Sequence, residues 1–182
     1  MEKRIAVNLL KNGYVVATLD PDSHSYHSWP LSDLTGDKTA EAFYDEAFDT
    51  WYVNYHMQSI VPDLTYIRRY TAYCKSIGLD AVVLLFETPD DFFVVEDELE
   101  IIEVLGYDCI ATVSYSFLQT EIDACQVEFE ERGIVPNKYG LLERLEDVEY
   151  FIELRQEVIA SGVNIEDFWP ETPARISIVN LA

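Results

Sequence analysis

The sequence predicts an α+β fold in which residues 1–182 form a single domain, with about five helices packed on a mixed β-sheet that begins with an N-terminal β-hairpin. Three observations lead to this prediction. Hydrophobic residues make up 49% of the chain and aromatic residues 13%, which is enough to fill a core at this length. After an opening pair of strands, segments with helical spacing alternate with single short apolar segments. No repeat, low-complexity tract or linker divides the chain.

The predicted hairpin pairs residues 5–10 with residues 14–19. Between them stands Asn12-Gly13, the dipeptide that best accommodates the positive φ angles of a type I′ turn. Residues 20–37 follow, and their abundance of Asp, Ser, Pro and His predicts a long surface loop.

The next segments are two helices and a strand. Over residues 38–57, large aromatic side chains recur at helical spacing and acidic residues occupy much of the remainder. A second helix begins at Pro62 and ends at Gly78, and its predicted inward-facing residues are Ile67, Tyr70, Cys74 and Ile77. Residues 81–86 are apolar throughout, which favours a central strand covered on both faces.

The second half of the chain continues this alternation. A third helix is predicted over residues 96–105 and ends at Gly106. The remaining predicted elements are a strand over residues 108–115, helices over residues 120–132 and 146–161, and a closing strand over residues 175–181. Helices that alternate with single strands favour a mixed sheet.

The cysteines and the apolar segments indicate the compartment. Cys74, Cys109 and Cys125 are odd in number and form no C-x-x-C motif, so we expect a reducing compartment and three buried thiols. A reactive thiol is the alternative role. The N-terminal apolar run ends at Leu10, too early for a signal peptide, and no run approaches the roughly 20 residues that span a bilayer. We therefore expect a cytoplasmic protein that does not enter a membrane.

Negative charge is the main functional signal in the sequence. The formal net charge is −22, and the segment between Lys75 and Arg132 holds 15 Asp or Glu residues without a Lys, Arg or His. Such a surface repels nucleic acids and acidic membranes and attracts basic macromolecules. The composition therefore argues against nucleic-acid binding and predicts a basic protein as the partner.

The densest acidic part of this segment predicts the partner-binding site. Four carboxylates share one face of the helix predicted over residues 96–105, and a nearby tyrosine can supply an aromatic anchor. The predicted partner-binding residues are Asp90, Asp91, Glu96, Asp97, Glu100, Glu103 and Tyr107. The alternative is a solvated face without a partner, because the N-terminus of a helix by itself stabilises acidic side chains in its first turn.

A metal-dependent hydrolase is the alternative function. The loop over residues 20–27 contains imidazole and carboxylate groups, which together suit zinc or another transition metal. Its candidate ligands are Asp22, His24 and His27, which Asp20 and His56 can join. No H-E-x-x-H, G-x-S-x-G, P-loop or G-x-G-x-x-G motif is present, so no catalytic residue and no cofactor is predicted.

The basic pair Arg68-Arg69 lies on the helix predicted to begin at Pro62. Two adjacent guanidinium groups can bind a phosphate. Ion pairs with nearby acidic side chains are the more common role of such residues on a helix, and we favour that interpretation.

Three short segments resemble parts of the small acidic immunity proteins of bacterial polymorphic toxin systems. The segments are residues 103–110 (EVLGYDCI), 114–116 (SYS) and 137–142 (NKYGLL). In that family an LG(Y/F)D step into a strand is followed by an N-x-x-G-L step and then by a helix with acidic and aromatic residues, here residues 147–155. The resemblance implies a cytosolic, non-catalytic protein that binds one cognate toxin or nuclease-type enzyme domain and covers its active site. It assigns no individual contact residue.

Overall fold

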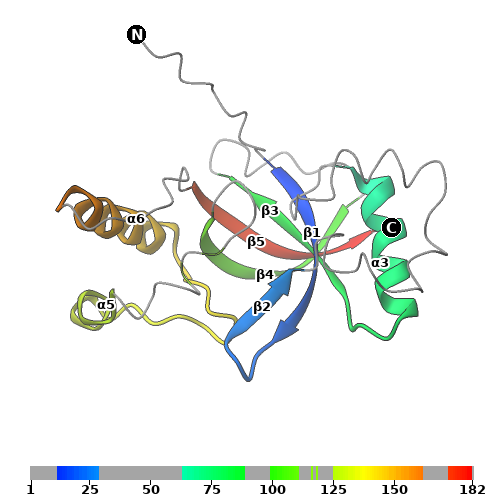
Figure 1. The fold of residues 1–182 in the computed structure, drawn as a ribbon, viewed down its shortest axis with the longest axis horizontal. Coiled ribbons are helices and arrows are strands. Elements are labelled where there is room, and N and C mark those ends of the chain that lie inside the picture. Colours follow the sequence, from blue (N-terminus) through cyan, green and yellow to red (C-terminus); the bar gives the residue numbers. More distant parts are fainter. Residues whose placement is uncertain are drawn as a thin grey trace, which may run out of the picture.

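A five-stranded antiparallel β-sheet forms the centre of the structure (Figure 1). The computed structural model describes residues 12–28, 63–88, 99–110, 116, 118, 125–161 and 172–181. In this part of the chain the elements are β1 (Asn12–Asp20), β2 (Ser25–Ser28), α3 (Leu64–Ser76), β3 (Val82–Glu87), β4 (Leu99–Ile110), α5 (Gln126–Arg132), α6 (Leu145–Ala160) and β5 (Thr172–Leu181).

The strand directions correct the predicted architecture. The strand order is β2-β1-β3-β5-β4, and each of the four pairings is antiparallel. The prediction of a mixed sheet with about five helices is therefore wrong, since the described residues form one antiparallel sheet and three helices. The alternation of helices and strands along the sequence does not determine strand direction. A connecting segment can end at either edge of the sheet, so the next strand can run parallel or antiparallel to its neighbour.

The opening hairpin also differs from the prediction. Asn12 and Gly13 lie within β1 and pair with Glu87 and Phe86 of β3, so they form no type I′ turn. The turn of the hairpin lies instead between β1 and β2, where the Asp20 carboxylate accepts hydrogen bonds from the backbone N–H (3.2 Å) and the hydroxyl (2.6 Å) of Ser23. Pairing with β3, which the local sequence does not show, holds Asn12-Gly13 in extended backbone. The predicted strand over residues 5–10 lies outside the described residues.

The third predicted helix is wrong as well. Residues 99–110 form β4, which pairs with β5 from Leu99↔Leu181 to Ile110↔Thr172. The β-branched residues Ile101, Ile102 and Val104 favour a strand. In addition, β4 forms backbone hydrogen bonds with β5, a distant segment that the local spacing of charged residues does not reveal.

Four other elements confirm their predictions. α3 begins after Asp63, whose Oδ1 accepts a hydrogen bond from the Tyr66 N–H at 3.0 Å. β3 lies at the centre of the sheet, as the apolar run predicted. α6 matches the predicted fifth helix, and β5 matches the predicted closing strand. The helix predicted over residues 38–57 lies outside the described residues, as do residues 120–124 and 111–115 of two further predicted elements.

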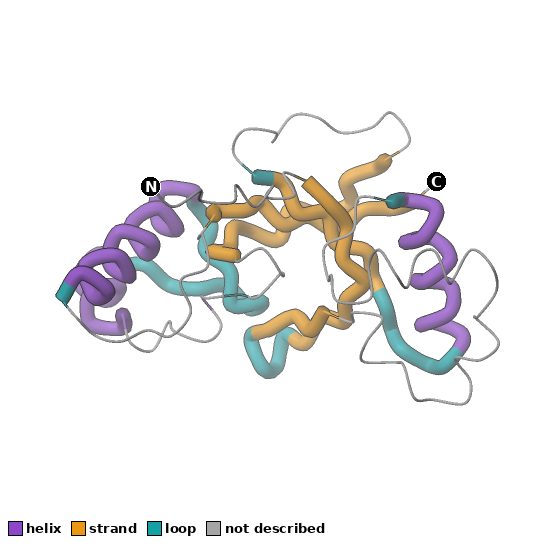
Figure 2. Tube along the Cα trace, turned by 45° about the horizontal axis from the view of Figure 1, so that its top comes forward, coloured by secondary structure: helices purple, strands orange, loops and turns teal. Residues whose placement is uncertain are grey.

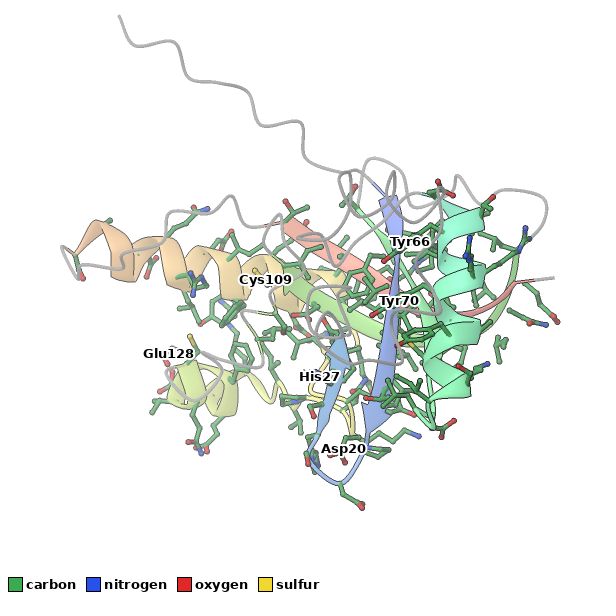
Figure 3. The ribbon with its side chains drawn as sticks, turned by 45° about the vertical axis from the view of Figure 1, so that its right-hand side comes forward. Asp20, His27, Tyr66, Tyr70, Cys109 and Glu128 are labelled. Carbon is green, nitrogen blue, oxygen red and sulfur yellow. The ribbon has the colours of Figure 1, made fainter. Side chains whose placement is uncertain are left out.

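Apolar clusters cover both faces of the sheet. α3 packs Tyr66 and Tyr70 against one face, toward which Figure 3 shows both rings pointing. On the other face Phe86 and Ile176 pack with Tyr139. The three cysteines are buried, as predicted. Cys74 belongs to the cluster beneath α3, and Cys109 and Cys125 belong to a third apolar cluster.

The third apolar cluster joins α5 and α6 to the C-terminal half of β4. Phe129 of α5 and Phe151 of α6 meet edge to face with their ring centroids 6.0 Å apart, and Cys109 of β4 packs with them. Figure 2 shows these two helices side by side, at the opposite end of the sheet from α3. No helix in the described ranges combines the length and the apolar character that crossing a membrane requires.

Candidate functional site

The candidate site lies where the edge strand β4 runs beside residues 137–143. The Tyr107 N–H donates to the Leu142 carbonyl at 2.8 Å, and the Leu142 N–H donates to the Tyr107 carbonyl at 2.9 Å. The Asn137 side chain donates from Nδ2 to the Leu105 carbonyl at 2.7 Å. Three hydrogen bonds therefore hold this segment against β4, although at least 30 residues of sequence separate the partners.

Gly106 makes this close approach sterically feasible. Its φ angle is +140°, and a Cβ atom at this position would lie 2.7 Å from the Leu142 carbonyl oxygen and 3.2 Å from Asn137 Nδ2. Asn137 shapes the segment further, because its Oδ1 accepts hydrogen bonds from the N–H groups of Tyr139 (2.9 Å) and Leu141 (3.3 Å). The predicted role of Gly106 as a helix stop is therefore replaced by close packing of two backbones.

Asp108 anchors the interior side of the same region. Its Oδ2 accepts a hydrogen bond from the Tyr26 hydroxyl at 2.8 Å, and its Oδ1 accepts from the Ser116 hydroxyl at 2.9 Å and the Cys109 N–H at 2.7 Å. Complete burial raises the pKa of the Asp108 carboxyl to about 6, although these hydrogen bonds oppose that shift. Desolvation and the adjacent Asp108 carboxylate likewise raise the pKa of Tyr26.

Described residues from each of the three segments that resemble immunity proteins take part in these contacts. Gly106 and Asp108 belong to the first segment, Ser116 to the second, and Asn137 to the third. These four residues therefore support the local structure on which the surface of the site is built.

A surface cavity of about 270 Å³, here called the acidic hollow, opens between β4 and this segment. The functional groups in its lining are the carboxylates of Glu103 and Glu143, the phenols of Tyr107 and Tyr139, and the ammonium of Lys138. A hydrogen bond to Tyr139 and the nearby charge of Glu103 raise the pKa of Lys138, whose Nζ lies 4.8 Å from the centroid of the Tyr139 ring. The acidic hollow thus already accommodates one cationic group.

Two of the predicted partner-binding residues, Glu103 and Tyr107, lie together in the acidic hollow. Glu100 lies on the same face of β4 as Glu103. The register shift at Ile102 explains this, since Glu100 pairs with Asn180 and Glu103 with Ile178, and residues two apart on β5 share a face. The other four, Asp90, Asp91, Glu96 and Asp97, lie outside the described residues.

The outer side of β4 is apolar beside these carboxylates. Ile101, Ile102 and Val104 expose 36%, 62% and 50% of their surfaces. Among the described residues, no strand pairs with the outer side of β4 between Leu99 and Leu105. Apolar edge strands of this kind are sites at which other chains add.

Three charged or phenolic side chains that line the acidic hollow were not among the predicted site residues: Lys138, Tyr139 and Glu143. Lys138 and Tyr139 stand in the NKYGLL segment, and Glu143 follows it directly, so the resemblance marked the segment but not its role. The pairing of Tyr107 with Leu142 places Glu143 and Glu103 in the lining of the same cavity.

The alternative metal loop forms the turn of the β1–β2 hairpin. Asp20 is near the hairpin tip in Figure 3, and its hydrogen bonds from Ser23 lower its pKa. His24 occupies the turn with a φ angle of +51°, and His27 pairs with Thr18 in the strand; both histidines are exposed, as is Asp22. Within the described ranges, no three His, Cys, Asp or Glu side chains are grouped closely enough to hold a metal ion. His56 lies outside these ranges.

Comparison with known proteins gives no relative: no family model matches the chain, and no curated protein or solved structure is significantly similar to it.

Proposed function

We propose that this protein is a non-catalytic inhibitor of the immunity-protein type, which binds a basic protein such as a toxin or nuclease-type enzyme domain. The acidic hollow receives a Lys or Arg side chain of that partner. The observation that carries the proposal is the lining of the acidic hollow, where the carboxylates of Glu103 and Glu143 accompany the rings of Tyr107 and Tyr139.

The size and chemistry of the acidic hollow support a side chain as its occupant. Its volume of about 270 Å³ is below the roughly 300–1,000 Å³ of small-molecule sites. Carboxylates form charge-assisted hydrogen bonds with guanidinium or ammonium groups, and tyrosine rings attract cations. Lys138 is exposed and has a flexible stem, so it can leave the acidic hollow when a partner's cation enters.

The surroundings of the acidic hollow support association with a protein. Ile101, Ile102 and Val104 give an exposed apolar surface on the adjacent edge, and burial of apolar area is the main favourable term in most protein association. The net charge of −22 accelerates encounter with a basic surface in a salt-dependent way.

Binding to the product of the gene immediately upstream tests the proposal. We expect the two purified proteins to associate in 50 mM NaCl and to dissociate more readily in 300 mM NaCl, as measured by isothermal titration calorimetry. Glu103→Gln combined with Glu143→Gln should weaken binding about tenfold or more, because a cation in the acidic hollow loses its charged partners. Lys138→Gln should tighten binding, since the competing ammonium is removed.

Glu149→Gln on α6 is the matched control, because it removes one exposed carboxylate that does not line the acidic hollow. If the upstream gene product and a panel of purified basic nucleases all fail to bind in 50 mM NaCl, the proposal is rejected. Equal effects of Glu149→Gln and of the variants in the acidic hollow would reject the site.

A further inference from the structure

The two carboxylates of the acidic hollow come from different segments of the chain. Glu103 belongs to β4, and Glu143 follows Leu142, which pairs with Tyr107 in antiparallel register. Glu143 therefore lies opposite Gly106, three residues along β4 from Glu103, which corresponds to about 10 Å of strand. Both side chains are exposed and line the same cavity. Negative charge is thus spread along the acidic hollow and does not converge on one point.

Lys138 shows how the acidic hollow holds an ammonium group. Its Nζ lies 4.8 Å from the centroid of the Tyr139 ring. A hydrogen bond to Tyr139 is the main cause of its raised pKa, and the charge of Glu103 makes a smaller contribution. The ammonium is therefore held mainly by one phenol. Because it is a compact charge, it is poorly suited to contact two separated carboxylates at once.

Arg144, next to Glu143 in the sequence, shows what a guanidinium does differently. Its Nε donates to Asp147 Oδ2 at 2.9 Å, and its Nη2 donates to Asp147 Oδ1 at 2.6 Å. A guanidinium carries five N–H donors in one plane, so these two bonds use only one edge of the group. A guanidinium that enters the acidic hollow therefore has donors for Glu103 and for Glu143, and its flat face can stack on a tyrosine ring.

Exposed apolar side chains adjoin these carboxylates. Val104 lines the acidic hollow and exposes 50% of its surface, and Ile102, two residues before it in β4, exposes 62%. Consecutive Cα atoms are only about 3.8 Å apart, so the sequence neighbour of a bound cation lies within reach of this surface. Glu100 is exposed on the same strand, and its charge disfavours an acidic neighbour. The surface therefore favours an apolar residue beside the cation.

We propose that the acidic hollow selects arginine over lysine and recognises an arginine that stands next to an apolar residue. The guanidinium donates to Glu103 and Glu143 and stacks on a tyrosine ring of the acidic hollow. The apolar neighbour covers Ile102 and Val104. This inference rests on the proposed function, and it defines the chemistry of the partner segment that enters the site.

Acetylated and amidated pentapeptides that differ in one feature are the probes. In ¹H–¹⁵N NMR titrations of the full chain, the peptide GVRVG should shift the amide signals of Tyr107, Lys138 and Glu143 with a dissociation constant of about 1 mM. GVKVG should bind about tenfold more weakly, because an ammonium cannot replace the planar set of donors. A counterpart with neutral citrulline in place of arginine should bind more weakly still. GGRGG, which lacks the apolar neighbours, should bind about fivefold more weakly than GVRVG.

Variants of the protein test the two parts of the site. Glu103→Gln and Glu143→Gln should each weaken GVRVG binding about fivefold and reduce the preference for arginine over lysine. Ile102→Ser should weaken binding of GVRVG but not of GGRGG. These residues are exposed, so the variants should keep the wild-type unfolding temperature. Glu149→Gln on α6 is the control, because it removes an equal charge away from the acidic hollow and should leave peptide binding unchanged.

Arginine selectivity is overturned if GVKVG or the citrulline peptide binds as tightly as GVRVG, or if GVRVG causes no shifts at about 10 mM. It is also overturned if Glu149→Gln weakens binding as much as the variants in the acidic hollow, because overall charge would then control the affinity. The titration with the upstream gene product tests the proposed function separately. Partner binding combined with equal affinities for GVRVG and GVKVG rejects only this inference, whereas GVRVG binding without any protein partner rejects only the proposed function.

Discussion

At the scale of single residues, Asp108 links parts of the chain that the sequence separates widely. Its carboxylate accepts hydrogen bonds from Tyr26 on β2 and from Ser116, and the backbone of Cys109 donates to it as well. Because the group has no exposed surface, its ionised form is disfavoured, and its pKa rises from 3.8 to about 6. The residue that joins these segments therefore makes folding dependent on pH.

The sign of this dependence follows from the raised pKa. At pH 3 Asp108 is protonated in both the folded and the unfolded chain. As the pH rises from about 4 to about 6, the unfolded chain loses the proton first, so the contribution of Asp108 to stability is lost; the loss amounts to about 3 kcal/mol. Asp108→Asn does not titrate. We therefore expect the free energy of unfolding of the wild type, relative to that of this variant, to fall across this range in urea titrations.

This comparison isolates Asp108 from the rest of the chain. Glu87, which receives hydrogen bonds from Arg175, also has a raised pKa because of burial, but it is present in both proteins and its effect cancels. Parallel pH profiles for the wild type and Asp108→Asn would contradict the prediction.

At the scale of elements, β4 shows most clearly why local patterns fail. The spacing of carboxylates and apolar side chains in the segment 96–105 fits a helix. Residues 99–110 nevertheless form a strand, which pairs with β5 along its whole length. Helix α3 could be predicted because its buried residues and its N-cap are all local. The strand-forming role of Asn12-Gly13 could not, because it depends on β3, more than 60 residues away.

The contact between β4 and residues 137–143 gives a prediction at this scale. Gly106→Ala should lower the free energy of unfolding by about 2–4 kcal/mol, because its φ angle is +140° and the new Cβ would be 2.7 Å from the Leu142 carbonyl oxygen. Gly133→Ala at the end of α5 is the matched control. It also has a positive φ angle, +66°, but no atom lies within 4 Å, so the expected loss is only about 1 kcal/mol.

Urea denaturation of both variants measures this difference. Since backbone strain is common to the two positions, the larger loss at Gly106 reports the close approach of Leu142 to β4. Similar losses in Gly106→Ala and Gly133→Ala would show that the segment does not pack on β4 in solution.

At the scale of the whole molecule, the unbalanced negative charge lowers the stability of the folded state. The chain of 182 residues has a net charge of −22, so its carboxylates repel one another. This repulsion is stronger in the compact folded state than in the unfolded chain. The described structure offsets part of it by ion pairs such as Arg144 with Asp147 (2.6 Å) and Arg175 with Glu87 (2.8 Å). The 34 Asp and Glu residues nevertheless far outnumber the 12 Lys and Arg residues, so most carboxylates have no cationic side chain to neutralise them.

Salt should therefore stabilise this protein. Raising NaCl from 10 to 500 mM shortens the screening length from about 30 Å to less than 10 Å, so we expect the unfolding temperature to rise by about 2 °C or more. Differential scanning calorimetry measures the shift, and KCl at equal ionic strength should give the same result. An unfolding temperature that stays constant or falls with salt would show that charge repulsion does not limit stability.

The sequence by itself determined the properties that depend on local order or on composition: the negative charge, the buried cysteines, α3, α6, and the apolar strands β3 and β5. Tertiary structure alone decided the antiparallel strand order, the extended state of β4, and the presence of both Glu103 and Glu143 in the lining of the acidic hollow. The physical reason is that helices satisfy their backbone hydrogen bonds within a few residues, whereas a strand satisfies them through partners anywhere in the chain. Where those partners lie decides which side chains become neighbours.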